Sequence, residues 1–186
     1  LAGFDIKSAE PLVELGANAD VAVGRDGTVY ALSTKRGEVV TIPTDPEGQP
    51  LQPQTSSIGE IKTPAAASIT AVGTTPVVLD AAGGQVRTPG GITTEVSVPD
   101  DAVLQQASAA ADSVAIATPT DLIRVPLDGA DPVTIPSGAG EGVPAEPVYL
   151  RGCAYAAWGV SAQFVRDCTG DAQDVEKPIP GAEEST

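Results

Sequence analysis

Four stretches of this sequence follow one plan, and that repetition constrains the fold more than any other feature. In each stretch, a run rich in Val, Ala, Ile and Thr ends at a small residue, turns, continues as a central strand, turns again and forms another strand. The stretches are 20–43, 68–90, 106–127 and 147–168. Their central strands correspond at Val29, Val77, Val114 and Ala154, which are 48, 37 and 40 residues apart.

Units of roughly 40–50 residues with several short strands each are typical of β-propeller blades, which pack radially and bury each other's faces. We therefore predict an all-β, β-propeller-like fold of about four blades, either a complete small ring or part of a larger propeller. The segments 93–99 and 131–136 would add an outer strand to two units, and the loop 43–57 lengthens the first interval. A β-sandwich is the alternative, because any all-β chain shows strands at intervals of roughly 8–12 residues.

Helical patterns are scarce in this chain. The 20 glycines and 17 prolines are spread along it, and the apolar spacing of an amphipathic helix is not sustained anywhere. The stretch 99–113 is the best exception and could form a helical turn. Aromatic residues make up only 3% of the chain, so the core must be built from many small side chains, which suits stacked sheets.

The chain is strongly acidic, with 25 Asp and Glu residues, 10 Lys and Arg residues and a formal net charge of −15. That charge repels nucleic-acid phosphates and anionic lipids, so we expect no nucleic-acid partner. No apolar run approaches the roughly 20 residues of a membrane helix, so we expect no direct membrane insertion. Because the chain opens on Leu1 without a signal sequence, we interpret it as part of a longer protein. The propeller-like domain would cover 1–180, and an acidic linker would start at 181–186.

Catalytic and metal-binding patterns are missing from the sequence. There is no histidine, which excludes His-dependent triads and His-ligated zinc. Asp26-Gly27 and Asp128-Gly129 predict tight turns, since a calcium loop needs about six to eight oxygen ligands. The glycine pairs at 83–84 and 90–91 lack the Lys-Ser/Thr and helix of a phosphate-binding loop. We therefore expect no enzyme activity, no metal and no cofactor.

Both cysteines lie in the stretch GCAYAAWGVSAQFVRDC. If the hairpin loop is 159–162, Trp158 faces Gln163 and Cys153 faces Cys168 across two antiparallel strands. Cα atoms of such pairs lie about 4.5–5.5 Å apart, within reach of a disulfide. A metal site would need further Cys or His ligands, and a redox pair is usually Cys-x-x-Cys. We therefore predict a structural disulfide, which persists in oxidising compartments and indicates an extracytoplasmic protein.

Tyr155 and Trp158 are candidate binding residues in the same stretch, because aromatic side chains are so few. They are three residues apart in one strand, so they point to opposite faces of the sheet. One is expected to pack between blades and the other to lie nearer the surface. Core packing is the favoured interpretation, since large rings dominate burial where they are scarce. Exposed rings would instead offer a platform for a carbohydrate.

The cysteine segment also carries a family resemblance. The run CAYAAW (153–158) followed by Arg-Asp-Cys (166–168), after a repeat such as GRDGTVYALSTKRGEVVTI, resembles the N-terminal extracytoplasmic region of large actinobacterial surface proteins. Those proteins carry fibronectin type III or other Ig-like domains further along the chain. The resemblance implies a multidomain cell-surface protein, membrane-anchored through a segment outside this chain, with a propeller-like outer portion. It carries over no catalytic residue.

These observations together predict a non-enzymatic, extracytoplasmic module of a cell-surface protein. It would scaffold or bind at the surface, with an unknown protein or a cell-wall glycan as its partner. One alternative is a glycan-binding or glycan-active propeller that uses acidic residues with Tyr155 or Trp158 around a central funnel. The other alternative is a passive stalk or spacer.

Overall fold

The computed structural model of the chain describes residues 13, 15–138, 142–159, 163–168 and 171–172. These residues form sixteen β-strands and one 3-10 turn at Pro64–Ala66. No helix in the described part of the chain is long and apolar enough to cross a membrane. The predicted linker at 181–186 lies outside the described residues.

The strands form four separate four-stranded antiparallel sheets, each made of strands in chain order. Blade 1 contains β1 (Asp20–Val23), β2 (Val29–Ser33), β3 (Glu38–Ile42) and β4 (Gln54–Ser57). Blade 2 contains β5 (Ala67–Val72), β6 (Thr75–Asp80), β7 (Gln85–Arg87) and β8 (Thr93–Glu95). Blade 3 contains β9 (Val103–Leu104), β10 (Ser113–Ala117), β11 (Asp121–Pro126) and β12 (Val133–Pro136). Blade 4 contains β13 (Val148–Leu150), β14 (Cys153–Trp158), β15 (Gln163–Cys168) and β16 (Asp171–Ala172).

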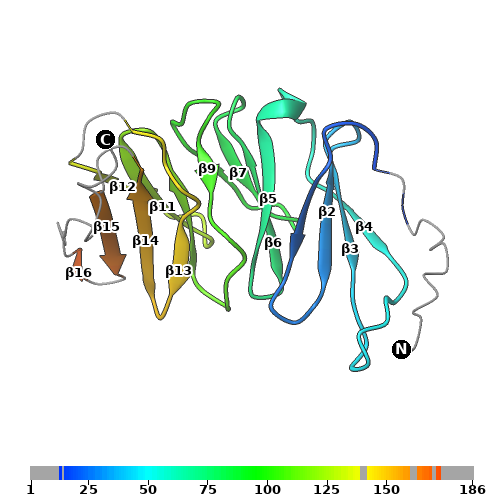
Figure 1. Cartoon of the computed structure of the whole chain (residues 1–186). Helices are drawn as coiled ribbons and strands as arrows, with labels where there is room; N and C mark the ends of the chain where they lie inside the picture. Colours follow the sequence, from blue (N-terminus) through cyan, green and yellow to red (C-terminus); the bar gives the residue numbers. More distant parts are fainter. Residues whose placement is uncertain (1–12, 14, 139–141, 160–162, 169–170, 173–186) are drawn as a thin grey trace, which may run out of the picture.

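The blades stand side by side in chain order, with blade 1 and blade 4 at the two ends of the row (Figure 1). Contacts between blades involve β1 with β5, β5 with β9 and β10 with β13. The first strand of each blade is therefore the inner one, and the fourth is the outer one. Four independent sheets confirm the propeller-like prediction and exclude two facing sheets of a sandwich.

The predicted correspondence of central strands is confirmed, because Val29, Val77, Val114 and Ala154 all lie in the second strand of their blades. The second strands are also the most deeply buried ones. In β6 every residue after Thr75 is buried, and in β10 all five residues are buried. A strand between two neighbours of its own sheet, with blades on both faces, must be apolar on both sides. This double burial is why the second strands give the clearest signal in the sequence.

The structure differs from the sequence prediction at two strands. The segment 43–57, expected as a loop, ends in β4, an outer strand whose four residues are all exposed and therefore show no apolar pattern. The first strand of blade 3 is β9, which precedes the expected stretch 106–111. The helical turn suggested for 99–113 does not form. Ser108 in this segment instead makes a parallel bridge to Val72, which connects the segment to blade 2.

Three apolar clusters fill the spaces between successive blades. The cluster between blades 1 and 2 includes Leu32 and Val78, and the one between blades 2 and 3 includes Leu79 and Val114. The cluster between blades 3 and 4 includes Ala115 and Trp158. Most of the buried side chains are Val, Ala, Leu or Ile, as the low aromatic content of the sequence predicts. Small branched side chains of this kind mesh on pleated surfaces that lie face to face.

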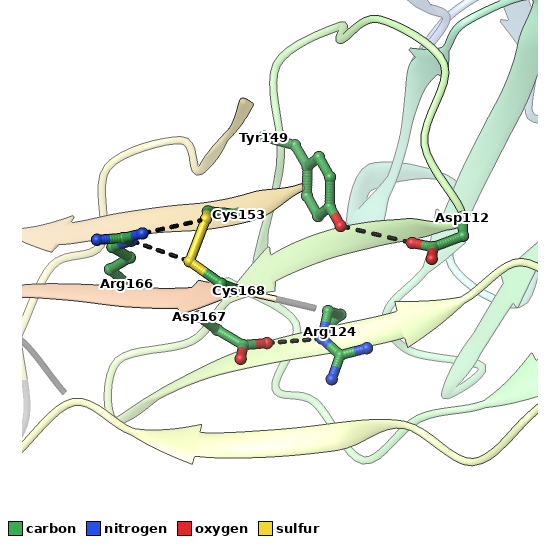
Figure 2. The surroundings of a disulfide bond; sticks show 7 residues. All are labelled: Asp112, Arg124, Tyr149, Cys153, Arg166, Asp167 and Cys168. Carbon is green, nitrogen blue, oxygen red and sulfur yellow. Dashed lines mark hydrogen bonds and ion pairs between the residues drawn. A yellow bond between two sulfur atoms is a disulfide. The ribbon is translucent and has the colours of Figure 1, made fainter. Parts of the chain in front are cut away.

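Polar side chains add specific links between neighbouring blades. Asp20 of blade 1 accepts a hydrogen bond from the backbone N–H of Ile69 in blade 2, at 2.8 Å. The Arg124 Nε of blade 3 lies 2.6 Å from Oδ2 of Asp167 in blade 4, and the Asp167 side chain is only 2% exposed (Figure 2). Because a buried carboxylate needs a partner, this pair fixes how blade 4 sits on blade 3.

Candidate functional site

The cysteine hairpin adopts the predicted register. Trp158 pairs with Gln163 and Cys153 with Cys168, and the two sulfur atoms form a disulfide (Figure 2). The Nε of Arg166 donates to Sγ of Cys168 at 2.9 Å, and another guanidinium nitrogen lies 3.6 Å from Sγ of Cys153. Cys153 is buried. The disulfide therefore joins the two strands of the hairpin covalently, which is a structural role.

The two aromatic candidates lie on opposite faces of β14, as expected. Trp158 is completely buried between blades 3 and 4, and its indole N–H donates to the carbonyl of Thr118 at 2.8 Å. Trp158 therefore packs in the core, as the favoured interpretation expected, and its ring presents no exposed surface to a ligand. Tyr155 is half-buried on the face of blade 4 turned away from blade 3. Neither ring lines either of the two hollows described below.

A hollow of about 380 Å³ lies along the inner strands of the blades. We call it the inner hollow, and it is lined by residues 20–23 of blade 1, 68–69 of blade 2, 102–107 around β9, and Glu146 ahead of β13. Its volume is within the usual range of roughly 300–1,000 Å³ for ligand sites. The inner hollow lies beside the first strands of blades 1, 2 and 3, and Glu146 comes just before the first strand of blade 4.

The inner hollow combines apolar side chains with a carboxylate rim. Val21 and Val23 are 51% and 55% exposed, whereas Ala22 between them is buried against blade 2. The Asp20 carboxylate accepts hydrogen bonds from the backbone of Val21 at 2.9 Å and of Ile69, which holds it in place at the edge. Glu146 is exposed on the side of blade 4. Such a surface fits a partner that carries apolar and cationic groups.

A second hollow of about 280 Å³ lies where the first strands of the blades turn into the second strands. We call it the turn hollow. Its lining comes from the β1–β2, β9–β10 and β13–β14 connections together with the end of β13: Arg25, Ala109, Ala110, Tyr149, Leu150, Arg151 and Gly152. Residues from these turns of blades 1, 3 and 4 therefore line one hollow.

Asp26 borders Arg25 in the first of these turns, and its carboxylate is engaged within the turn. Oδ1 accepts a hydrogen bond from the Thr28 backbone N–H and Oδ2 accepts one from the Thr28 hydroxyl, both at 3.0 Å. The backbone hydrogen bond from Thr28 is the main reason why the pKa of Asp26 lies below its ordinary value. Gly27 follows with a φ of 85°, which confirms the predicted Asp-Gly turn.

Sequence reasoning missed the residues that line both hollows. Val21 and Val23 occupy alternate positions of a short strand, a pattern that a core strand shows equally well. Arg25 and Arg151 are far apart in the sequence and line the same hollow only in the folded chain. One signal for the turn hollow was present in the sequence. Arg151 precedes Gly152 in a two-residue hairpin turn, where the first position normally carries Asn, Asp or Gly, so an arginine there is unusual. In the described part of the chain, no group of three or more Cys, Asp or Glu residues is placed to hold a metal ion.

The four stacked blades and the hollows at their inner edges place the chain in the β-propeller class of folds. No protein-family model and no curated protein sequence matches it. Among solved structures it is similar to virginiamycin B lyase from Staphylococcus aureus, with 13% identity and a TM-score of 0.56 over 86% of this chain and 55% of the lyase. A catalytically inactive variant of that lyase with quinupristin matches at 12% identity and a TM-score of 0.56, over 90% and 58% of the two chains.

This similarity concerns the fold alone, because the sequences are so different. The chain spans little more than half the length of either lyase structure. The lyase is itself a β-propeller.

Proposed function

We propose that this chain is a non-enzymatic binding module that holds a segment of a partner protein in its inner hollow, outside the cytoplasm. The exposure of Val21 and Val23 carries the proposal. Eight of the eleven other strand valines of blades 1–3 are buried, whereas these two are about half exposed on an inner strand. Apolar side chains exposed together at a concave site are a common mark of a binding surface.

The polar groups of the inner hollow indicate the chemistry of the partner. Asp20 and Glu146 flank the valines, and the Gln106 side chain is exposed nearby. A loop with one branched apolar side chain and a Lys or Arg would bury its apolar part on Val21 and Val23 and pair with these carboxylates. The high negative charge of the chain would also speed the approach of a cationic segment.

The disulfide supports an extracytoplasmic setting for this binding module. Disulfides such as Cys153–Cys168 form and persist in oxidising compartments and are rare in the cytosol. The resemblance of the cysteine segment to actinobacterial surface proteins points to the same setting. We therefore propose a cell-surface parent protein that is anchored through a segment outside this chain.

Site-specific photo-crosslinking tests the proposed binding face. A photoreactive phenylalanine analogue would replace Val23 in the inner hollow, and a matched variant would carry it at Thr55, which is exposed on the outer strand β4. We expect a discrete protein adduct in the producing cells from position 23 and none from position 55. Equal adducts at both positions, or no adduct from position 23, would contradict the proposal.

A further inference from the structure

Two arginines from different blades line the turn hollow in a chain that is otherwise acidic. Arg25 lies in the β1–β2 turn of blade 1 and Arg151 in the β13–β14 turn of blade 4, and both are exposed. Neither guanidinium has a hydrogen-bond or ion-pair partner among the residues that the structure describes. The chain has only 10 basic residues to balance 25 acidic ones, so two unpaired cations around one hollow contribute nothing evident to folding.

The carboxylates next to these arginines are occupied by other groups. Asp26 follows Arg25, but both of its oxygens accept hydrogen bonds from Thr28. Asp112 accepts a hydrogen bond from the hydroxyl of Ser113 at 2.9 Å. It also accepts one from the hydroxyl of Tyr149 at 3.5 Å (Figure 2). These carboxylates are thus paired with Thr28, Ser113 and Tyr149 and not with the arginines, whose guanidinium groups keep their donors for a ligand.

The backbone at Arg151 is unusual for an arginine. Arg151 and Gly152 are the two central residues of the β13–β14 hairpin, with φ values of 51° and 77°. A type I′ turn of this kind favours Asn, Asp or Gly at its first central position, because longer side chains are strained at positive φ. Strained residues persist most often at sites where they serve a function. This turn holds the Arg151 side chain at the rim of the hollow.

The segment of blade 3 that lines the turn hollow is apolar and is held by hydrogen bonds at its start. Ala109 and Ala110 follow Ser108, whose backbone bridges to blade 2 through hydrogen bonds of 2.9 Å with Ala71 and 3.0 Å with Gly73. The Gln105 side chain braces the same segment by donating to the Ser108 hydroxyl at 3.0 Å and accepting from the Ala115 N–H at 2.7 Å. A preorganised wall of this kind lowers the cost of ordering a ligand.

From these features we infer that the turn hollow is a binding site for a small anionic group, a carboxylate or a phosphate, held by Arg25 and Arg151. Guanidinium groups present paired N–H donors that match the oxygen atoms of both kinds of anion. The methyl groups of Ala109 and Ala110 and the side chain of Leu150 would contact an apolar part next to the anion. This site is distinct from the inner hollow, so it does not depend on the binding function proposed above.

Anion titrations followed by NMR test this inference on the full chain. Acetate and inorganic phosphate would be titrated separately at constant ionic strength, with chloride as the control anion, while the backbone amides of Ala110 and Gly152 are monitored. We expect saturable shifts with acetate or phosphate and none with chloride. The anion that binds more tightly identifies the carboxylate or the phosphate as the group recognised.

Two variants assign the site to the arginines. Arg151→Asn suits the left-handed turn and should fold normally, and Arg25→Gln removes the other cation. Each should weaken binding about tenfold or more, because each removes charge-assisted hydrogen bonds. Arg36→Gln, whose arginine pairs with Glu38 at 3.0 Å in another turn, is the matched control and should bind like the parent chain. Shifts that stay linear with every anion, or an affinity that Arg151→Asn leaves unchanged, would overturn the inference.

Discussion

Removing the positive partner of the ion pair between blades 3 and 4 should destabilise the fold far more than removing the negative one. The Asp167 side chain is 2% exposed and the Arg124 side chain 16% exposed, with Nε and Oδ2 2.6 Å apart. In Arg124→Met the Asp167 carboxylate stays buried without its cation, which costs about 3–5 kcal/mol. In Asp167→Leu the longer arginine side chain can turn toward water, so we expect a smaller loss of about 1–3 kcal/mol.

The double variant Arg124→Met/Asp167→Leu makes this reasoning quantitative. It leaves no buried charge, so its loss of unfolding free energy should be smaller than that of Arg124→Met alone. Urea denaturation followed by the fluorescence of Trp158, which lies at the same blade interface, would measure all three variants. The exposed pair Arg36–Glu38 supplies the control, because Arg36→Met should cost no more than about 1 kcal/mol. If Arg124→Met costs no more than this control, or if the double variant is the least stable, the buried Asp167 carboxylate does not depend on its cation.

Three further predictions concern the disulfide and the turns. Reduction of the disulfide, which joins residues 15 positions apart, should lower the unfolding free energy by up to about 3 kcal/mol, measured by urea denaturation with and without reductant. Gly37→Ala should destabilise strongly because a Cβ there would collide with the backbone of Gly59, whereas Gly48→Ala meets open space and should cost only about 1 kcal/mol from its positive φ. The pKa of Asp26 is lowered mainly by the backbone hydrogen bond from Thr28, so its contribution to stability is present above its ordinary value of 3.8 and is lost as pH falls through the lower pKa of the folded state. Asp26→Asn should therefore weaken the fall in stability below about pH 4, and an unchanged pH profile would count against this role.

The parts of the fold that sequence alone predicted are those where one local rule is decisive. The second strands are apolar on both faces, so they stand out wherever a blade occurs. The cysteine hairpin was predictable because one loop placement sets the pairing of every residue in both strands, and Cys153 then meets Cys168. The Asp-Gly turns follow from the need for a positive φ.

The parts that sequence did not predict depend on position within the arc. The strand β4 has the sequence QTSS and is exposed at all four residues, so only its place at the outer edge of blade 1 makes it a strand. The exposure of Val21 is set by its place on the inner strand of blade 1, beside the inner hollow, and not by its own residue type. Arg25 and Arg151 line one hollow because the turns of blades 1, 3 and 4 lie around it, and no local sequence pattern predicts that arrangement.

The repeats pack as blades in chain order, and the single tryptophan, Trp158, reports on that packing directly. Trp158 of blade 4 donates its indole N–H to the carbonyl of Thr118, which directly follows β10 of blade 3. The indole proton gives one well-separated NMR resonance. We predict that it exchanges slowly with solvent and shows nuclear Overhauser contacts to Thr118 and its neighbours. An indole proton that exchanges immediately, or that contacts residues of blade 1 instead, would contradict the packing of blade 4 on blade 3.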